Sequence, residues 1–260
     1  MDDNDEDNER FVRLLRQVFR FLHLVLHVLA GVFLTAILVG LQRRATDPSY
    51  RSLKRWWLHR VVKIIGGQVS VYGEPAPVGS LLASNHVSWL DIPLLGGQTE
   101  LTFLSKSEVK DWPVLGWLAA KSGTLFIERG KRDGAKGASE CIAKRLEQQE
   151  RVLMFPEGTT SDNKNTLPFH ARLFAAAVTA QAPIQPVAIH YLNMQGQTHP
   201  LVPYLTPQTL MQNLWAILAE PKILIEVHFL ASIDSQSVPR KALATYTEQQ
   251  IRLALRLNSA

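Results

Sequence analysis

The stretch Ser80-Leu81-Leu82-Ala83-Ser84-Asn85-His86-Val87-Ser88-Trp89-Leu90-Asp91 decides the fold that this sequence predicts. Its first five residues form a short apolar run after a turn rich in Gly and Pro, which is typical of a buried strand. His86 therefore lies in the loop just beyond that strand. A second run, residues 152–155, leads in the same way to Glu157. Because ligands bind outside the carboxyl ends of the strands in open α/β sheets, we expect both loops to face one crevice.

Strands and helices alternate along most of the chain. With 260 residues, 46% of them hydrophobic, the sequence has room for one core of respectable size. The pattern predicts an α/β layered domain with a largely parallel central sheet flanked by helices, preceded by an N-terminal pair of membrane-anchoring helices. The expected strands are residues 68–72, 80–84, 101–104, 124–127, 152–155, 184–189 and 223–229, and the expected helices include 135–149, 171–181, 207–218 and 241–257.

The pair His86 and Asp91 has the residue types of a general base with its own orienting carboxylate. A structural alternative is also concrete, because Ser88-x-x-Asp91 has the form of a capping box, in which the carboxylate only satisfies a backbone donor at a helix start. Pro93 weakens that alternative, since a proline inside the helix lacks the amide that its hydrogen bond needs. Both interpretations remain open at the level of the pair alone.

Four ordered motifs together resemble the glycerolipid acyltransferase family, whose best-known members acylate lysophosphatidic acid. The first motif is Asn-His-x-Ser-Trp-x-Asp at 85–91. The second extends from Phe-Leu-Ser-Lys at 103–106 through Trp-Pro-x-x-Gly at 112–116 to Phe-Ile-Glu-Arg-Gly at 126–130. The third is Phe-Pro-Glu-Gly-Thr at 155–159, and the fourth is Ala-Pro-Ile-Gln-Pro-Val-Ala at 182–188. The resemblance runs from about residue 73 to 191. It implies His86 as base, Asp91 as orienting acid, Lys106 and Arg129 as basic head-group ligands, and Glu157 with Gly158, Thr159 and Thr160 as the second substrate loop.

The sequence departs from the resemblance at Thr160. Members that use lysophosphatidic acid usually carry Arg at this position, and a threonine hydroxyl offers one neutral donor where arginine gives a bidentate cation. The form Gly-Thr-Thr-Ser-Asp is similar to that of members that acylate lyso-ornithine lipid, an acceptor with no phosphate. Lys106 and Arg129 still offer charge for a phosphate. We therefore expect 1-acylglycerol 3-phosphate as the first acceptor and lyso-ornithine lipid as the alternative.

The chemistry expected from these residues is acyl transfer from a thioester. His86 takes the proton of an acceptor hydroxyl while Asp91 fixes its tautomer, so no acyl-enzyme intermediate is needed. Backbone amides of the Glu157-Gly158 loop are a hypothesis for stabilising the oxyanion. The simpler interpretations are a turn residue for Glu157 and solvated surface charges for Lys106 and Arg129. Two other functions stay open, namely a membrane-anchored lipid-binding protein without turnover and a thioesterase.

The N-terminal region divides into two parts ahead of a domain at 66–260. Residues 1–20 are expected to form a tail, acidic and disordered at first and then basic, because the first ten residues hold six acids and one base. Residues 21–65 are expected to anchor the chain. Residues 21–41 contain no Asp, Glu, Lys or Arg and would form a helix of about 31 Å, near the thickness of a bilayer core. Residues 49–65 read as a basic amphipathic helix. A spanning helix and a re-entrant helix are equally compatible, since both flanks are positive.

Composition narrows the partners and cofactors. Beyond residue 10 the chain carries 27 bases against 17 acids, which suits an anionic membrane or an acidic carrier protein better than nucleic acid, for which there is no binding motif. No motif for a metal, a nucleotide or a serine hydrolase is present, so we expect no metal and no cofactor, with acyl-CoA or acyl carrier protein as co-substrate. The lone Cys141 permits no internal disulfide. The expected location is a bacterial inner membrane, with the catalytic domain on the cytoplasmic side.

Overall fold

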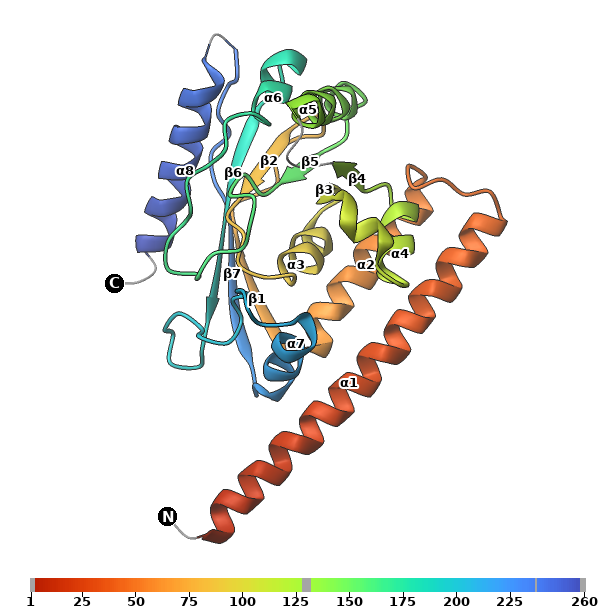
Figure 1. Ribbon diagram of the computed structural model, residues 1–260, viewed down its shortest axis with the longest axis vertical. Coiled ribbons are helices and arrows are strands. Elements are labelled where there is room, and N and C mark those ends of the chain that lie inside the picture. The colour runs from red at the N-terminus through yellow and green to blue at the C-terminus, as the bar shows by residue number, and fades with distance from the viewer. Residues whose placement is uncertain (1–2, 128–131, 237, 258–260) are drawn as a thin grey trace.

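The computed structural model describes residues 3–127, 132–236 and 238–257 and forms an α/β layered domain with a long helix along one side (Figure 1). The elements in chain order are α1 (Asp3–Gly40), α2 (Pro48–Ile64), β1 (Gly67–Tyr72), β2 (Leu81–Ser84), α3 (Asp91–Gln98), β3 (Thr102–Lys106), the 3-10 helix η1 (Ser107–Asp111), α4 (Leu115–Lys121), β4 (Leu125–Ile127), α5 (Arg132–Glu147), β5 (Val152–Met154), α6 (Ala175–Ala180), β6 (Ile184–Leu192), α7 (Leu210–Ala219), β7 (Ile223–Phe229) and α8 (Arg240–Leu257).

The sheet confirms the expected fold class. Its strand order is β1-β7-β6-β2-β5-β3-β4, and each neighbouring pair is parallel except β6 with β7. β2 and β5 are direct neighbours, so their carboxyl ends lie side by side at one edge of the sheet. Since those ends lead to His86 and Glu157, the topology brings the two predicted loops together.

Alternation along the central strands builds two cores, one on each face of the sheet. Leu82 and Leu153 point to the face covered by α2, α3 and α7, whereas Leu81 and Val152 point to the face covered by α5, α6 and α8. Successive side chains of a strand point to opposite faces, so a run that is buried throughout must be covered twice. This explains why the central strands read as continuous apolar runs.

The expected disordered tail at the N-terminus is wrong, because α1 runs without a break from Asp3 to Gly40. Acidic side chains in the first turns of a helix interact favourably with its dipole, and Glu6 pairs with Arg10 at 3.7 Å, one turn later. The acidic segment is therefore the start of the helix that the apolar segment continues.

α1 lies against the domain at two places along its length. Near its middle, Arg16 and Arg20 donate to carbonyls at the end of α7, including Arg16 Nη1 to Ala219 O at 2.6 Å and Arg20 Nη1 to Glu220 O at 2.6 Å. These carbonyls lack partners within their own helix, and cations are favourable at a helix C-terminus. Further along, His27 stacks on Trp57 of α2 with ring centroids 5.0 Å apart, and each side chain bonds to the other residue's carbonyl at 3.0 Å.

The opposite side of α1 is apolar and exposed. Its large exposed side chains recur at helical spacing, at Phe11, Leu15, Phe19, Leu22, Leu26, Leu29 and Phe33. The segment Glu6–Gly40 is long and apolar enough to cross a membrane, and 11% of its most apolar window is buried inside the protein. Since an exposed apolar stripe of this length is costly in water, α1 presents a surface suited to lipid.

One predicted helix is shorter than expected. The sequence suggested a helix over residues 171–181, whereas α6 covers Ala175–Ala180. The amides of Ala175 and Ala176 bond to the carbonyls of Arg172 and Leu173, three residues back, so the preceding segment is a series of turns and not an α-helix.

Candidate active site

His86 and Asp91 form a hydrogen-bonded pair at the carboxyl edge of the sheet. His86 lies two residues after the end of β2, and Asp91 is the first residue of α3. The distance from His86 Nδ1 to Asp91 Oδ2 is 2.7 Å. The Asp91 side chain is fully buried and that of His86 is 21% exposed, so the pair has one closed side and one open side.

The Asp91 carboxylate serves the backbone as well as His86. Its Oδ2 also accepts from the amides of Val87 at 2.7 Å and Ser88 at 3.0 Å, and the second of these is one of the two bonds of a capping box. The rest of the capping box is absent, because Ser88 Oγ has no hydrogen-bond partner among the described residues and α3 begins at Asp91 with no side-chain cap. The carboxylate therefore does more than satisfy a backbone donor, because it also bonds to His86. Because the same oxygen closes the tight loop and contacts the imidazole, the loop fixes the position of the His86 ring.

Tyr191 of β6 holds the other oxygen of Asp91. Its hydroxyl donates to Asp91 Oδ1 at 2.7 Å, and both groups are fully buried. Burial raises the pKa of Tyr191 well above its usual value of 10, and the neighbouring Asp91 charge raises it further. The tyrosine is thus a permanent donor to the carboxylate at physiological pH.

Glu157 fastens the second loop to the first. Its Oε1 accepts from the amide of His86 at 2.7 Å and its Oε2 accepts from the amide of Leu167 at 2.7 Å. Burial raises the pKa of the Glu157 carboxyl, and these two amide hydrogen bonds oppose that shift. From the same loop, Ser161 N donates to His86 O at 2.7 Å, so both backbone groups of His86 are held. Glu157 lies beside His86 as predicted, but both its oxygens are used by the backbone.

Two asparagines anchor the loops on β6. β6 pairs with β2 only through Val187, so the backbone groups of the following residues need other partners. Asn85 exchanges two hydrogen bonds with the backbone of Ile189, at 2.8 and 2.9 Å, and Asn163 exchanges two with Tyr191, at 2.7 and 3.3 Å. These side-chain amides take the place of a neighbouring strand and set the position of both loops against Tyr191.

The open side of His86 presents its second ring nitrogen. The ring stacks on Phe155 with centroids 4.0 Å apart. With Nδ1 bonded to Asp91, Nε2 has no hydrogen-bond partner among the residues that the structure describes. A neutral imidazole held in this way has an unprotonated Nε2, which is the form that accepts a proton from a hydroxyl group.

The other predicted site residues lie on the same edge with different degrees of engagement. Lys106 is exposed at the end of β3, the neighbour of β5. Gly158 has a φ of 77°, which suits glycine, and its amide donates to Phe155 O at 3.2 Å within the turn. Thr159 is exposed, whereas the hydroxyl of Thr160 donates to the carbonyl of Tyr204. Arg129 lies outside the residues that the structure describes.

A large apolar cavity is lined in part by Trp89, in the loop between His86 and Asp91, and by Ile92 of α3. It has a volume of about 360 Å³ and lies between α1, α2, α3, α4 and α7. Lys54 of α2 and Ser122 after α4 also line the cavity. An apolar cavity of about 150 Å³ holds a benzene molecule with six carbons, so by volume this one has room for a chain of about 14 carbons.

Local sequence patterns did not predict the contacts of Tyr191 and Asn163, or the position of Lys54 in the lining of the cavity. Asn85 belongs to a motif that the sequence singled out, although its partner on β6 was not predictable. Tyr191 is separated from Asp91 by 100 positions. Only the packing of β6 against β2 shows that Asn85, Asn163 and Tyr191 all help to position the pair of His86 and Asp91.

Comparisons with known proteins give consistent results. The model of the acyltransferase family matches residues 68–190. The chain is 40% identical over 247 residues to a lyso-ornithine lipid O-acyltransferase of Pseudomonas aeruginosa, covering 94% of each chain. It is 36% identical over 184 residues to a 1-acyl-sn-glycerol-3-phosphate acyltransferase of Neisseria gonorrhoeae, covering 69% of this chain and 72% of that one. Its fold is similar to the crystal structure of a 1-acyl-sn-glycerophosphate acyltransferase of Thermotoga maritima, with a TM-score of 0.70, 20% identity and coverage of 97% and 98%.

Proposed function

The chain belongs to the acyltransferase family and acts on lysolipids, and we propose that its acceptor is lyso-ornithine lipid. The observation that carries the proposal is the state of Thr160. Its hydroxyl is bonded to the carbonyl of Tyr204, so the position that usually holds a phosphate-binding arginine offers neither a cation nor an available donor. This reverses the order of acceptors expected from the sequence.

The relatives support the same choice. Identity and coverage are both higher for the lyso-ornithine lipid enzyme, at 40% and 94%, than for the Neisseria enzyme, at 36% and 69%. Ornithine in amide linkage carries one carboxylate and one amine in place of a phosphate dianion. The exposed Lys106 matches a carboxylate as a single point charge.

In the proposed reaction His86 is the general base. Its Nε2 removes the proton from the acceptor hydroxyl as the oxygen attacks the thioester carbonyl, and Asp91 stabilises the imidazolium that forms. The tetrahedral intermediate collapses with loss of the thiolate, which takes the proton back from His86. Glu157 positions the backbone of His86 in this scheme and does not bind the head group. Gly158 is not assigned to the oxyanion, because its amide is used within the turn.

The apolar cavity would hold the fatty acyl chain of the substrate. It adjoins the loop of His86, and α1 supplies part of its wall. The acyl donor in this proposal is acyl-CoA or acyl carrier protein. No cofactor is required, because a thioester is already activated.

The protein would lie on one face of the membrane, with α1 in the plane of the bilayer. α1 contacts α7 around Arg16 and Arg20 and contacts α2 around His27, so the domain lies alongside the helix. A spanning α1 would carry these flanks of the domain into the hydrocarbon core. The basic residues around α1 favour the cytoplasmic face.

The test is an acceptor panel with one labelled acyl thioester, supplied first as CoA and then as carrier-protein ester. We expect the wild type to acylate lyso-ornithine lipid at least about tenfold faster than lysophosphatidate, which corresponds to about 1.4 kcal/mol of discrimination. His86→Ala should lose transfer by about 10²-fold or more. His170→Ala is the matched control, because that side chain is exposed and only its backbone amide is bonded to the Glu157 loop.

Each other outcome has a distinct meaning. A preference for lysophosphatidate would show that the acceptor is 1-acylglycerol 3-phosphate, as first expected from the sequence. Release of free fatty acid without acylated lipid would indicate a thioesterase. Binding of lysolipid without any turnover, or full activity of His86→Ala, would contradict the mechanism.

A further inference from the structure

Most polar groups of the two loops around His86 are already bonded within the protein. Both oxygens of Glu157 accept backbone amides, and the hydroxyl of Thr160 donates to the carbonyl of Tyr204. The amide of Gly158 is used inside its own turn. The amine of an ornithine head group therefore needs a partner outside these groups.

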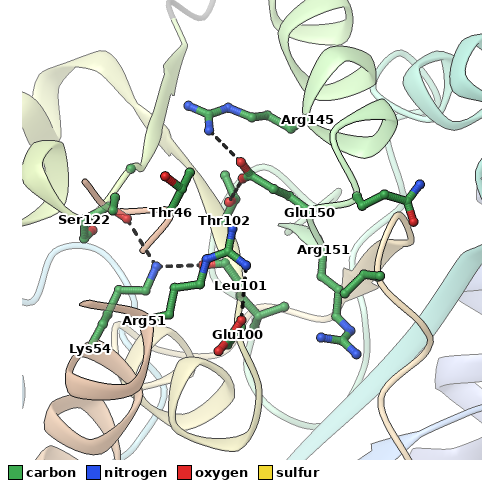
Figure 2. Close-up of a pocket in the computed structure, with 14 residues that line it drawn as sticks. Thr46, Arg51, Lys54, Glu100, Leu101, Thr102, Ser122, Arg145, Glu150 and Arg151 are labelled. Carbon is green, nitrogen blue, oxygen red and sulfur yellow. Dashed lines mark hydrogen bonds and ion pairs between the residues drawn. The ribbon is translucent and has the colours of Figure 1, made fainter. Parts of the chain in front are cut away.

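A polar pocket at the opposite edge of the sheet is too distant to supply that partner. It lies beside Thr102, the first residue of β3, whereas Lys106 ends the same strand at the edge where His86 lies (Figure 2). The two ends of β3 are about 13 Å apart at about 3.3 Å per residue. Inside the pocket, Arg145 and Glu150 pair with each other at 2.8 Å. The amine has to bind at the carboxyl edge of the sheet.

The segment between β6 and α7, residues 193–209, bonds to both loops of the site. The amide of Tyr204 donates at 3.0 Å to the carbonyl of Val87, the residue after His86. The carbonyl of Tyr204 accepts from the hydroxyl of Thr160. One residue of this segment is thus joined to the first loop by its amide and to the second loop by its carbonyl.

Asn213 of α7 holds this segment in place. Its side chain is fully buried, and its Nδ2 donates to the carbonyls of Leu201 at 3.1 Å and Pro203 at 3.3 Å. Its Oδ1 accepts from the indole of Trp89, in the first loop, at 2.9 Å. Because one amide group bonds to both the segment and the loop, Tyr204 is positioned before an acceptor binds, which lowers the entropy that binding costs.

The phenol of Tyr204 is available for a ligand. The side chain is half-buried, and its hydroxyl has no hydrogen-bond partner among the residues that the structure describes. Tyr191 differs, because its hydroxyl is buried and bonded to Asp91. A tyrosine ring has a negative face that attracts a cation, and its oxygen can accept a hydrogen bond from an ammonium group. The same ring face gives no attraction to a phosphate dianion.

We propose that Tyr204 is a specificity-determining residue, which binds the amine of the acceptor head group against its ring. The proposal rests on the proposed function, because it takes lyso-ornithine lipid as the acceptor. Residues 193–209 then form the third wall of the acceptor site. Lys106 takes the carboxylate of the head group and Tyr204 takes the amine, so the two ends of the ornithine are bound by different segments.

The experiment compares two acceptors that differ only in the amine. One is lyso-ornithine lipid, and the other is the same lipid built on norvaline, which has a hydrogen in place of the amine. We expect kcat/KM of the wild type to be about tenfold higher for the ornithine acceptor. In Tyr204→Leu this ratio should fall to about one, with transfer to the norvaline acceptor unchanged, because the lost ring contacts only the amine.

Two further variants separate the ring from other effects. Tyr204→Phe keeps the ring without the hydroxyl, so its ratio should stay within about threefold of the wild type. Tyr246→Leu is the matched control, because that tyrosine is 49% exposed on α8. Its ratio should equal that of the wild type.

Thermal unfolding is recorded with each acceptor, because a ligand that binds only the folded state raises the unfolding temperature. This binding readout needs no turnover. A wild type that prefers lysophosphatidate, or that transfers nothing, would contradict the proposed function alone, and the difference in unfolding temperature between the two acceptors would still test Tyr204.

Three results would overturn the proposal itself. The first is a wild type that does not distinguish the two acceptors in either readout. The second is a folded Tyr204→Leu protein that keeps the wild-type ratio, which would place the amine elsewhere. The third is an equal loss with both acceptors in that variant, which would give Tyr204 a purely structural role.

Discussion

Replacing Tyr191 by phenylalanine removes a single hydroxyl group from behind the reactive pair. That hydroxyl is the donor to Asp91 Oδ1, at 2.7 Å, whereas His86, Val87 and Ser88 all donate to Oδ2. A hydrogen bond to a charged group contributes about 1.5–3 kcal/mol, and burial leaves no bulk water to replace it. We therefore expect the free energy of unfolding of Tyr191→Phe to fall by about 2 kcal/mol.

The effect on turnover should be smaller than that full energy implies. If all of about 1.5–3 kcal/mol were lost from the transition state, kcat would fall by about 10-fold to 150-fold. The carboxylate is ionised both before and during proton transfer, so only part of the interaction differs between the two states. We expect kcat to fall about tenfold through poorer positioning of the imidazole, with KM unchanged because Tyr191 lies behind Asp91.

Steady-state transfer to the lysolipid and chemical unfolding would be measured on the same preparations. Tyr246→Phe is the control, since that ring is 49% exposed on α8. A Tyr191→Phe protein that matches the wild type in both kcat and unfolding free energy would refute the role that we give to this hydrogen bond. A rise in KM at constant kcat would equally contradict it, because it would place the hydroxyl in contact with substrate.

Three other perturbations have defined outcomes. Glu157→Gln replaces one acceptor oxygen by a donor, so the amide of either His86 or Leu167 loses its partner. Chemical unfolding should show a free energy of unfolding lower by about 2 kcal/mol, and an unchanged midpoint would contradict the role of Glu157 in joining the two loops. Thr160→Arg should raise the rate with lysophosphatidate relative to lyso-ornithine lipid by about tenfold in competition assays, and an unchanged ratio would exclude this position from acceptor choice. The pKa of Lys54 is about 8 in the folded protein against 10.5 for the free side chain, so the unfolded chain binds more protons between those values. The free energy of unfolding of the wild type, measured relative to that of Lys54→Met, should therefore rise as the pH increases from 8 to 10.5. A decrease of this difference with rising pH would contradict the burial of Lys54.

The part of the site that the sequence predicted is the part carried by strand ends. Two short apolar runs indicated buried strands, and parallel strands place the loops that follow them at one edge. β2 and β5 are in fact neighbours, so His86 and Glu157 meet through the direct bond from the His86 amide to the glutamate. Local sequence was sufficient to place His86 and Glu157, because each lies in the loop directly after its strand.

The parts that the sequence did not predict depend on contacts between distant segments. Tyr191 was assigned only to the region of the last motif, and its bond to Asp91 exists because β6 packs beside β2. The sequence placed Glu157 in the substrate loop, and this role stays a prediction; the two backbone amides that its oxygens accept were not predicted. A sequence pattern identifies a carboxylate, but it does not show which donors surround it after folding.

The contribution of α1 to the cavity has a practical consequence. This helix contributes six residues to the lining of the apolar cavity, namely Leu24, Val28, Gly31, Leu34, Thr35 and Leu38. A shortened chain that begins after Gly40 would retain the imidazole and its carboxylate yet lack one side of the compartment beside them. In the proposed function this helix both attaches the protein to the membrane and forms part of the acyl-chain site, so removal of residues 1–40 is expected to give a soluble domain without transfer activity.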